Sequence, residues 1–152
     1  MNSDIPTIPG VTPQDRLQRI VDAYETLSPA TVPMLAALYA ADARFKDPFN
    51  DIEGRGAIAR VFEHMFAQVS EPRFVIGTRV AQCSDAFLTW EMDFRMARLN
   101  GVQTLRGATH LRFDEHGLIA LHRDYWDAAE ELYEKLPLVG GLMRLLKRRI
   151  AP

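Results

Sequence analysis

The stretch LYAADARFKDPF, residues 38–49, followed shortly by EGRGAIARVFEHMF, residues 53–66, carries most of the information about the fold. Residues 43–46 suit a short strand, and the chain must then leave helical geometry at Asp47 because Pro48 follows it. After this point apolar side chains return at three- and four-residue steps, which is helical spacing. The stretch therefore predicts a short strand, a structured loop and a helix in succession.

Two helices are expected before this stretch. The first is predicted over residues 13–27, because Thr12 can cap it, Pro13 suits its first position and apolar residues recur on one face. The second is predicted over residues 31–41, with Tyr39 on its apolar stripe. Both stripes indicate packing against a core.

After the central helix the hydrophobic period changes to two. Four strands are predicted over residues 73–83, 87–98, 102–113 and 118–127. Short turn signals such as Asn100-Gly101 separate them, as expected of consecutive antiparallel hairpins. The order of elements predicts an α+β protein whose helices pack on one face of a curved antiparallel sheet.

The faces of these strands can be assigned only in part. In the second strand Trp90 and Met92 share an apolar face, which indicates core or cavity wall. In the fourth strand His122, Asp124 and Trp126 alternate with residues that are also partly apolar. Periodicity alone therefore does not decide which face of that strand is buried.

Composition is that of one globular domain. The chain has 152 residues, of which 47% are hydrophobic and 25% charged, enough for a single core without disulfides. Its one cysteine, Cys83, excludes an internal disulfide and fits a reducing compartment. The four histidines show no metal-ligand spacing, so neither a metal nor a cofactor is expected.

Charge and hydropathy narrow the possible partners. The formal net charge is −2, and five bases with no acid lie from Lys135 onward, so the main body is acidic and nucleic-acid binding by it is not expected. The sequence has no leader-like or membrane-spanning stretch, and a cytoplasmic location is expected.

The two ends of the chain are expected to lie outside the domain. Residues 1–12 are predicted to form a loose arm, and residues 128–152 a basic amphipathic helical extension of the main domain at 13–127. The extension would make weak contact with an anionic membrane surface or a partner, or would cover an apolar edge or a cavity mouth. The sequence leaves these alternatives open.

The order of elements, the acid before Pro48, the Gly-x-x-Ala-Ile helix start at residues 54–58 and the closing hairpins resemble the nuclear-transport-factor-2-like superfamily. The resemblance covers residues 13–127 and is greatest to its SnoaL-like and ketosteroid-isomerase-like branch. It implies a cone-shaped, cystatin-like α+β fold in which a curved antiparallel sheet and the N-terminal helices enclose an apolar cavity. It also implies a homodimer.

The same resemblance implies a site. It places Asp47 where ketosteroid-isomerase-like proteins keep a general base, Tyr24 near their tyrosine donor, and Thr109 where they have a protonated aspartic acid. It also turns His122 and Asp124 toward the cavity. The candidate catalytic residues are therefore Asp47, His122 and Asp124, and the candidate substrate-binding residues are Tyr24, Tyr39, Trp90, Met92, Thr109 and Trp126.

Several functions fit this constellation. The first is proton transfer on an apolar small molecule, in the isomerase or cyclase class, with Asp47 as base. For this class, Thr109 cannot replace the protonated carboxyl group of the familiar steroid-isomerase mechanism. Activation of a water, as in epoxide-hydrolase-like relatives, is a second function. A non-catalytic protein that binds an apolar ligand, or a module that docks through its C-terminal helix, is also consistent. Asp47 can equally be a turn-forming residue.

Overall fold

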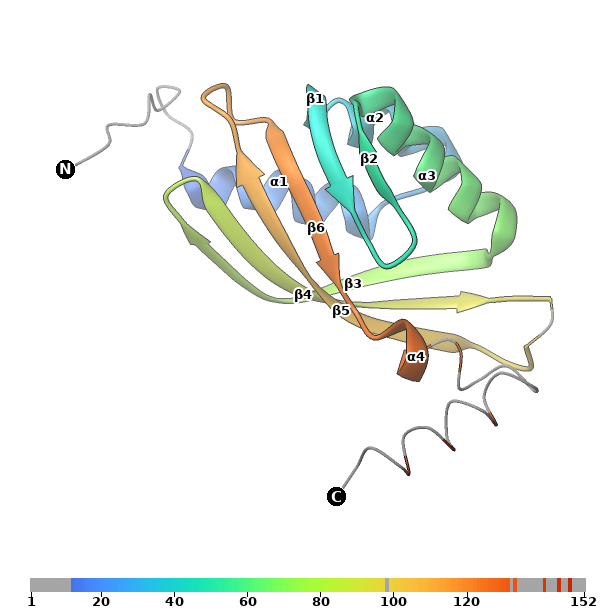
Figure 1. Ribbon diagram of the computed structural model, residues 1–152. Helices are drawn as coiled ribbons and strands as arrows, with labels where there is room; N and C mark the ends of the chain where they lie inside the picture. The colour runs from blue at the N-terminus through green and yellow to red at the C-terminus, as the bar shows by residue number, and fades with distance from the viewer. Residues whose placement is uncertain are drawn as a thin grey trace.

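The computed structural model describes residues 12–97 and 99–131, together with residues 133, 141, 145 and 148. The elements follow one another along the chain (Figure 1) as α1 (Pro13–Glu25), η1 (Pro29–Thr31), α2 (Val32–Ala36), β1 (Tyr39–Lys46), β2 (Asp51–Glu53), α3 (Arg55–Gln68), β3 (Ser70–Gln82), β4 (Asp85–Arg95), β5 (Gln103–Phe113), β6 (Ile119–Tyr125) and α4 (Ala128–Glu131).

The strands form one curved, open sheet in the order β2-β1-β6-β5-β4-β3. The expected α+β architecture, with the N-terminal helices packed on a curved sheet, is confirmed. One detail of the expectation is wrong, because the sheet is mixed rather than antiparallel throughout. The first strand, β1, runs parallel to β6, with Phe45 opposite His122, while the other neighbouring pairs are antiparallel.

Helix α1 begins and packs as its sequence predicts. Thr12 and Asp15 form a capping box, in which the Thr12 side chain accepts from the Asp15 amide and the Asp15 carboxylate accepts from the Thr12 amide. The carboxylate of Glu25 accepts a hydrogen bond of 2.9 Å from the Ile76 amide on β3. This contact ties the end of α1 to the far edge of the sheet and so fixes the position of Tyr24 one residue earlier.

The helix predicted over residues 31–41 is much shorter than expected. Helix α2 spans only Val32–Ala36, and Tyr39 lies on β1 instead. Met34, which the helical pattern places on the apolar stripe, is 71% exposed. Alanines make this segment compatible with a helix, but pairing of β1 with β6 overrides that local preference. A further strand, β2, occupies part of the loop expected after Pro48.

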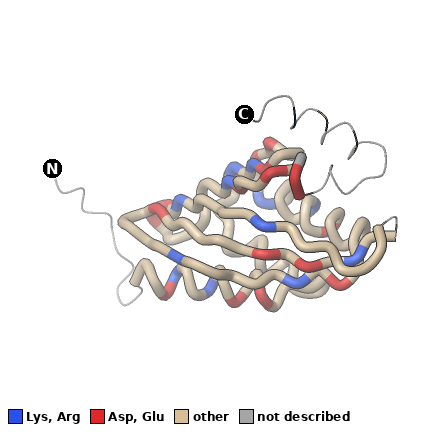
Figure 2. The backbone as a smooth tube through the Cα atoms, turned by 90° about the horizontal axis from the view of Figure 1, so that it is seen from below, with Lys and Arg blue, Asp and Glu red and all other residues tan. Residues whose placement is uncertain are grey.

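The predicted terminal segments lie mostly outside the described residues. Of the arm at 1–12 only Thr12 is described, and of the extension at 128–152 only α4 and four single positions. No helix within the described part of the chain is long and apolar enough to cross a membrane. Figure 2 shows Lys and Arg positions interspersed with Asp and Glu positions along the backbone.

Gly107 on β5 faces Trp90 on β4 at a distance that leaves no room for a side chain. A Cβ atom at Gly107 would lie 2.4 Å from Cζ2 of the indole, and the two residues are cross-strand partners. A glycine inside a strand commonly marks such a close approach. The indole lies against the bare backbone of β5, and its orientation depends on this glycine.

Gly107→Ala is therefore expected to lower the free energy of unfolding by about 1–3 kcal/mol, because the indole must move within a packed core. Gly56→Ala, a helical position where the added Cβ meets only ordinary contact, is the control and is expected to be neutral or stabilising. Urea unfolding of the two variants checks this. Equal stability of the Gly107 variant and the unmodified chain would contradict the packing described.

Candidate functional site

A cavity of about 590 Å³ lies between the helices and the sheet. Side chains from α1, α3 and all six strands line it, and most of them are apolar, including Phe62, Phe74, Leu88, Leu105 and Leu111. Its size falls in the range of small-molecule sites. Eight of the nine predicted site residues border this cavity, namely Tyr24, Asp47, Trp90, Met92, Thr109, His122, Asp124 and Trp126.

Tyr39, the ninth predicted residue, does not line the cavity. Its placement on β1 rather than on a helix buries it completely behind His122, with its ring stacked on the imidazole at a centroid distance of 5.9 Å. The guanidinium of Arg55 donates to the Tyr39 carbonyl through Nε at 2.7 Å. The prediction of direct substrate contact by Tyr39 is therefore corrected to a supporting role for His122.

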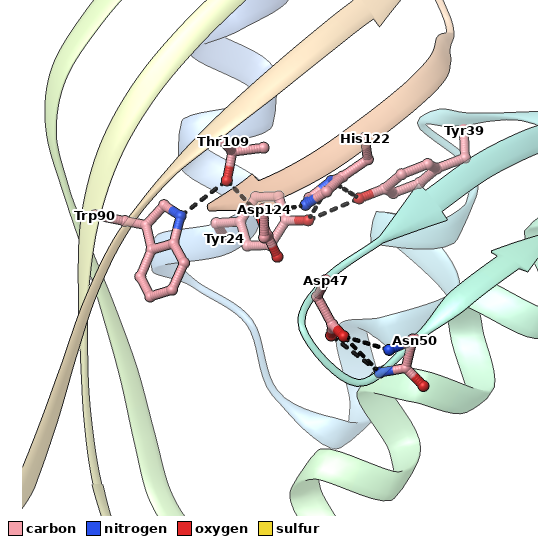
Figure 3. A network of polar contacts seen from close by, with 8 residues as sticks. All are labelled: Tyr24, Tyr39, Asp47, Asn50, Trp90, Thr109, His122 and Asp124. Atoms are coloured by element: carbon pink, nitrogen blue, oxygen red, sulfur yellow. Dashed lines mark hydrogen bonds and ion pairs between the residues drawn. The ribbon is translucent and has the colours of Figure 1, made fainter. Parts of the chain in front are cut away.

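A chain of hydrogen bonds begins at Trp90 and leads to Asp124 (Figure 3). The indole Nε1 donates to Thr109 Oγ1 at 2.8 Å, and Thr109 Oγ1 donates to Asp124 Oδ1 at 2.5 Å. An indole N–H can only donate, so the threonine oxygen must accept from it and use its own proton toward Asp124. The direction of the chain makes Asp124 Oδ1 an acceptor.

The chain continues on the other side of Asp124. His122 Nε2 lies 2.8 Å from the same Oδ1, and His122 Nδ1 lies 2.8 Å from the Tyr39 hydroxyl. The Tyr39 hydroxyl is 2.7 Å from that of Tyr24, which is 3.4 Å from Nδ1. His122 and Asp124 have side chains that are only 4% and 16% exposed, so these groups must satisfy one another.

A count of protons assigns the tautomer of His122. With Nε2 protonated, Tyr24 donates to Tyr39, Tyr39 donates to Nδ1, and Nε2 donates to Asp124. If Nδ1 also carried a proton, one of the two tyrosine hydroxyls would lose its acceptor within this buried group. An unpaired buried hydroxyl is costly. The neutral imidazole with Nε2 protonated is therefore the form that this geometry favours.

Burial sets the ionisation of the two tyrosines. Loss of solvation raises the pKa of Tyr24 far above its ordinary value, and the neighbouring Tyr39 and Asp124 raise it further. Loss of solvation likewise raises the pKa of Tyr39, against a smaller lowering by the hydrogen bond from Tyr24. Both hydroxyls hence keep their protons and remain available as donors across the ordinary pH range.

The carboxylate of Asp47 lines the cavity but serves the turn between β1 and β2. Its Oδ1 accepts from the amides of Phe49 at 2.7 Å and Asn50 at 2.6 Å, and both of its oxygens accept from Asn50 Nδ2 at 3.0 Å. This is the turn role that an Asp before proline commonly has. Figure 3 shows Asp47 and Asn50 paired apart from the chain around His122.

Four cavity-lining residues are themselves exposed and mark the mouth: Phe49, Arg60, His64 and Gln68. The Phe49 ring meets that of Trp126 edge-on at a centroid distance of 5.4 Å and that of Tyr133 at 6.3 Å. None of these four residues is among the site residues predicted from the sequence. For the three on the central helix, the sequence pattern that could have indicated them is a polar residue at every fourth position, beside apolar residues 57, 61 and 65.

The described residues contain no group of three or more histidines, cysteines or acids placed to hold a metal ion.

The buried tyrosines make stability depend on pH in the alkaline range. Their folded pKa lies above the value of 10.0 expected unfolded, so their stabilisation is complete below pH 10 and is lost as pH rises further. Each contributes a slope of up to about 1.4 kcal/mol per pH unit. Tyr39→Phe should reduce the slope of the unfolding free energy against pH, by at most the value that corresponds to one proton. Urea unfolding between about pH 8 and pH 11 can measure this slope.

The slope is the readout in that experiment, because loss of the Tyr39 hydrogen bonds lowers stability at every pH. An identical alkaline slope for the variant and the unmodified chain would contradict the burial of this hydroxyl.

Solved structures with the same fold are numerous. One is a hypothetical protein with a ketosteroid-isomerase-like fold from Catenulispora acidiphila, in complex with trimethylamine; it is 17% identical, with a TM-score of 0.69, over 82% of this chain and 93% of that one. An NTF2-like protein of unknown function from Burkholderia pseudomallei is 18% identical, with a TM-score of 0.67, over 76% and 92%. At these identities the likeness shows the fold alone.

Another NTF2-like protein of unknown function, from an Exiguobacterium species, is 16% identical, with a TM-score of 0.64, over 74% of this chain and 98% of that one. No curated protein matches the chain. The model of the SnoaL-like domain family matches residues 19–122, which includes the second half of α1, the cavity-lining helix α3 and the strands up to His122. The chain has the fold of NTF2-like proteins and belongs to the SnoaL-like family.

Proposed function

We propose that this protein binds an apolar small molecule in its cavity and transfers a proton on it, with Asp124 as the base. The observation that carries the proposal is the unequal use of the two Asp124 oxygens. Oδ1 accepts from both Thr109 and His122, whereas Oδ2 has no hydrogen-bond partner among the described residues. One oxygen is thus fixed and the other is free at the wall of an apolar cavity.

A carboxylate held in this way suits proton abstraction beside a carbonyl group. A general base must be positioned before the reaction, and the two hydrogen bonds at Oδ1 fix the plane of the carboxylate. The proton taken up at Oδ2 leaves those bonds intact, so the same oxygen can return it to another atom of the substrate. This sequence of uptake and return is what an isomerase or cyclase of this class requires.

His122 acts on Asp124 through its position. Because Nδ1 accepts a hydrogen bond from Tyr39, Nε2 carries the ring proton. Nε2 then donates a hydrogen bond to Oδ1, which stabilises the ionised carboxylate. Phe45, whose ring centroid lies 4.6 Å from that of His122, and Tyr39 pack against the imidazole and hold its plane. His122 is in this account a positioning residue, supported by Tyr39 from behind.

Asp47 remains the alternative base, as the family resemblance implies. It lines the same cavity, and its involvement would require part of its bonding to Asn50 to give way to a substrate proton. A third possibility is that the cavity binds its ligand without turnover. One pair of variants distinguishes these three cases.

The test is exchange of the α-hydrogens of a small bicyclic ketone, 2-tetralone, for deuterium in heavy water, followed by NMR. Asp124→Asn is expected to slow the protein-catalysed exchange by about a hundredfold or more, and Asp47→Asn to change it by no more than about threefold. Quenching of tryptophan fluorescence controls for binding, because both tryptophans of the chain line the cavity.

The opposite ranking of the two variants would move the base to Asp47. Quenching by the ketone without any catalysed exchange in the unmodified protein would contradict catalysis and favour a binding protein. Both variants must show unchanged quenching for either conclusion to hold.

A further inference from the structure

The mouth of the cavity carries an unpaired cation. Arg60 on α3 lines the cavity and is exposed to solvent, and its guanidinium has no hydrogen bond or ion pair with any described residue. Several arginines in the sheet differ: Arg95, Arg106 and Arg112 each pair with a carboxylate at 3.1–3.2 Å. Arg60 therefore presents free donors where a ligand would enter.

Among the described residues, no acidic neighbour of Arg60 compensates its charge. Asp47, an acid that also lines the cavity, has its oxygens engaged by Asn50 and by backbone amides. Glu63, three residues further along α3, does not line the cavity and forms no ion pair with Arg60. The side chains that follow Arg60 at four-residue steps, His64 and Gln68, also offer hydrogen-bond donors to the opening.

We propose that the ligand is an apolar molecule with a carboxylate at one end, and that Arg60 binds this carboxylate. This inference rests on the proposed function, since it names the substrate class of the same cavity. A guanidinium presents two parallel N–H groups that match a carboxylate, and the bond is partly shielded by the surrounding cavity wall. The apolar body of the ligand then occupies the space lined by the strands.

Charge also determines the orientation of such a ligand. The Asp124 side chain is only 16% exposed, and a ligand carboxylate placed beside the proposed base would be repelled and left with little solvent. The acid therefore stays at Arg60, and a carbon atom further along the molecule is brought to Asp124. Arg60 thus favours the orientation in which the ligand carboxylate lies at the mouth, and Asp124 disfavours the reversed orientation.

The experiment compares dansyl-labelled undecanoic acid with its methyl ester, detected by energy transfer from the cavity tryptophans. The acid is expected to bind the unmodified protein about tenfold more tightly than the ester. Arg60→Gln should remove this preference, because it lowers the affinity for the acid about tenfold and leaves the affinity for the ester unchanged. Arg73→Gln, an exposed arginine on β3 that does not line the cavity, is the matched control and should retain the preference.

Added salt gives a second readout. Rising sodium chloride should weaken binding of the acid and leave the ester unaffected. Equal affinity for acid and ester, or an acid preference that survives Arg60→Gln, would overturn the proposal while leaving the proposed function intact. Binding of neither probe to the unmodified protein would overturn both, because the cavity would then accept no apolar ligand.

Discussion

The hydrogen bond between His122 Nε2 and Asp124 Oδ1 is the contact on which the arrangement of the site depends. Two ionisable groups on one strand face a largely apolar interior, and neither can stay there unless its remaining atoms find partners. Thr109 satisfies Asp124 from β5, and Tyr39 satisfies His122 from β1. The two neighbours of β6 in the sheet thus each supply one hydroxyl group.

This requirement gives a physical role to features of the fold that otherwise look incidental. The parallel pairing of β1 with β6 brings Phe45 opposite His122 and sets Tyr39 behind the imidazole. The absence of a side chain at Gly107 lets the Trp90 indole lie flat enough to reach Thr109. Helix α1, tied to β3 through Glu25, delivers the Tyr24 hydroxyl to the end of the chain.

Local sequence patterns were sufficient for the helix at residues 13–27, the helix that follows Gly54 and the four long strands, whereas the family resemblance supplied the candidate residues of β6. Caps, prolines and alternation are short-range signals, and they predicted α1, α3 and β3 to β6 within a few residues. The parallel strand β1 was mistaken in part for a helix, because its pairing partner lies some eighty residues later. The role of Tyr39 was missed for the same reason.

Other parts of the site depend on contacts that no local pattern shows. The family resemblance predicts that Asp47 is a general base, but its hydrogen bonds to Asn50 arise from the shape of the turn. Arg60 looks like an ordinary solvent-facing residue of an amphipathic helix until the cavity beside it is known. The homodimer, the cytoplasmic location and the docking role of the C-terminal extension remain predictions.

The proposed role of Asp124 depends on the direction of the hydrogen-bond chain, and nitrogen-15 NMR of the His122 side chain measures that direction directly. At neutral pH we expect a protonated Nε2 and an unprotonated Nδ1 that accepts from Tyr39, with Tyr39→Phe perturbing the Nδ1 resonance most. A proton on Nδ1, with Nε2 free, would mean that His122 donates to Tyr39 and accepts from Asp124. That result would contradict an ionised Asp124 and with it the proposed base.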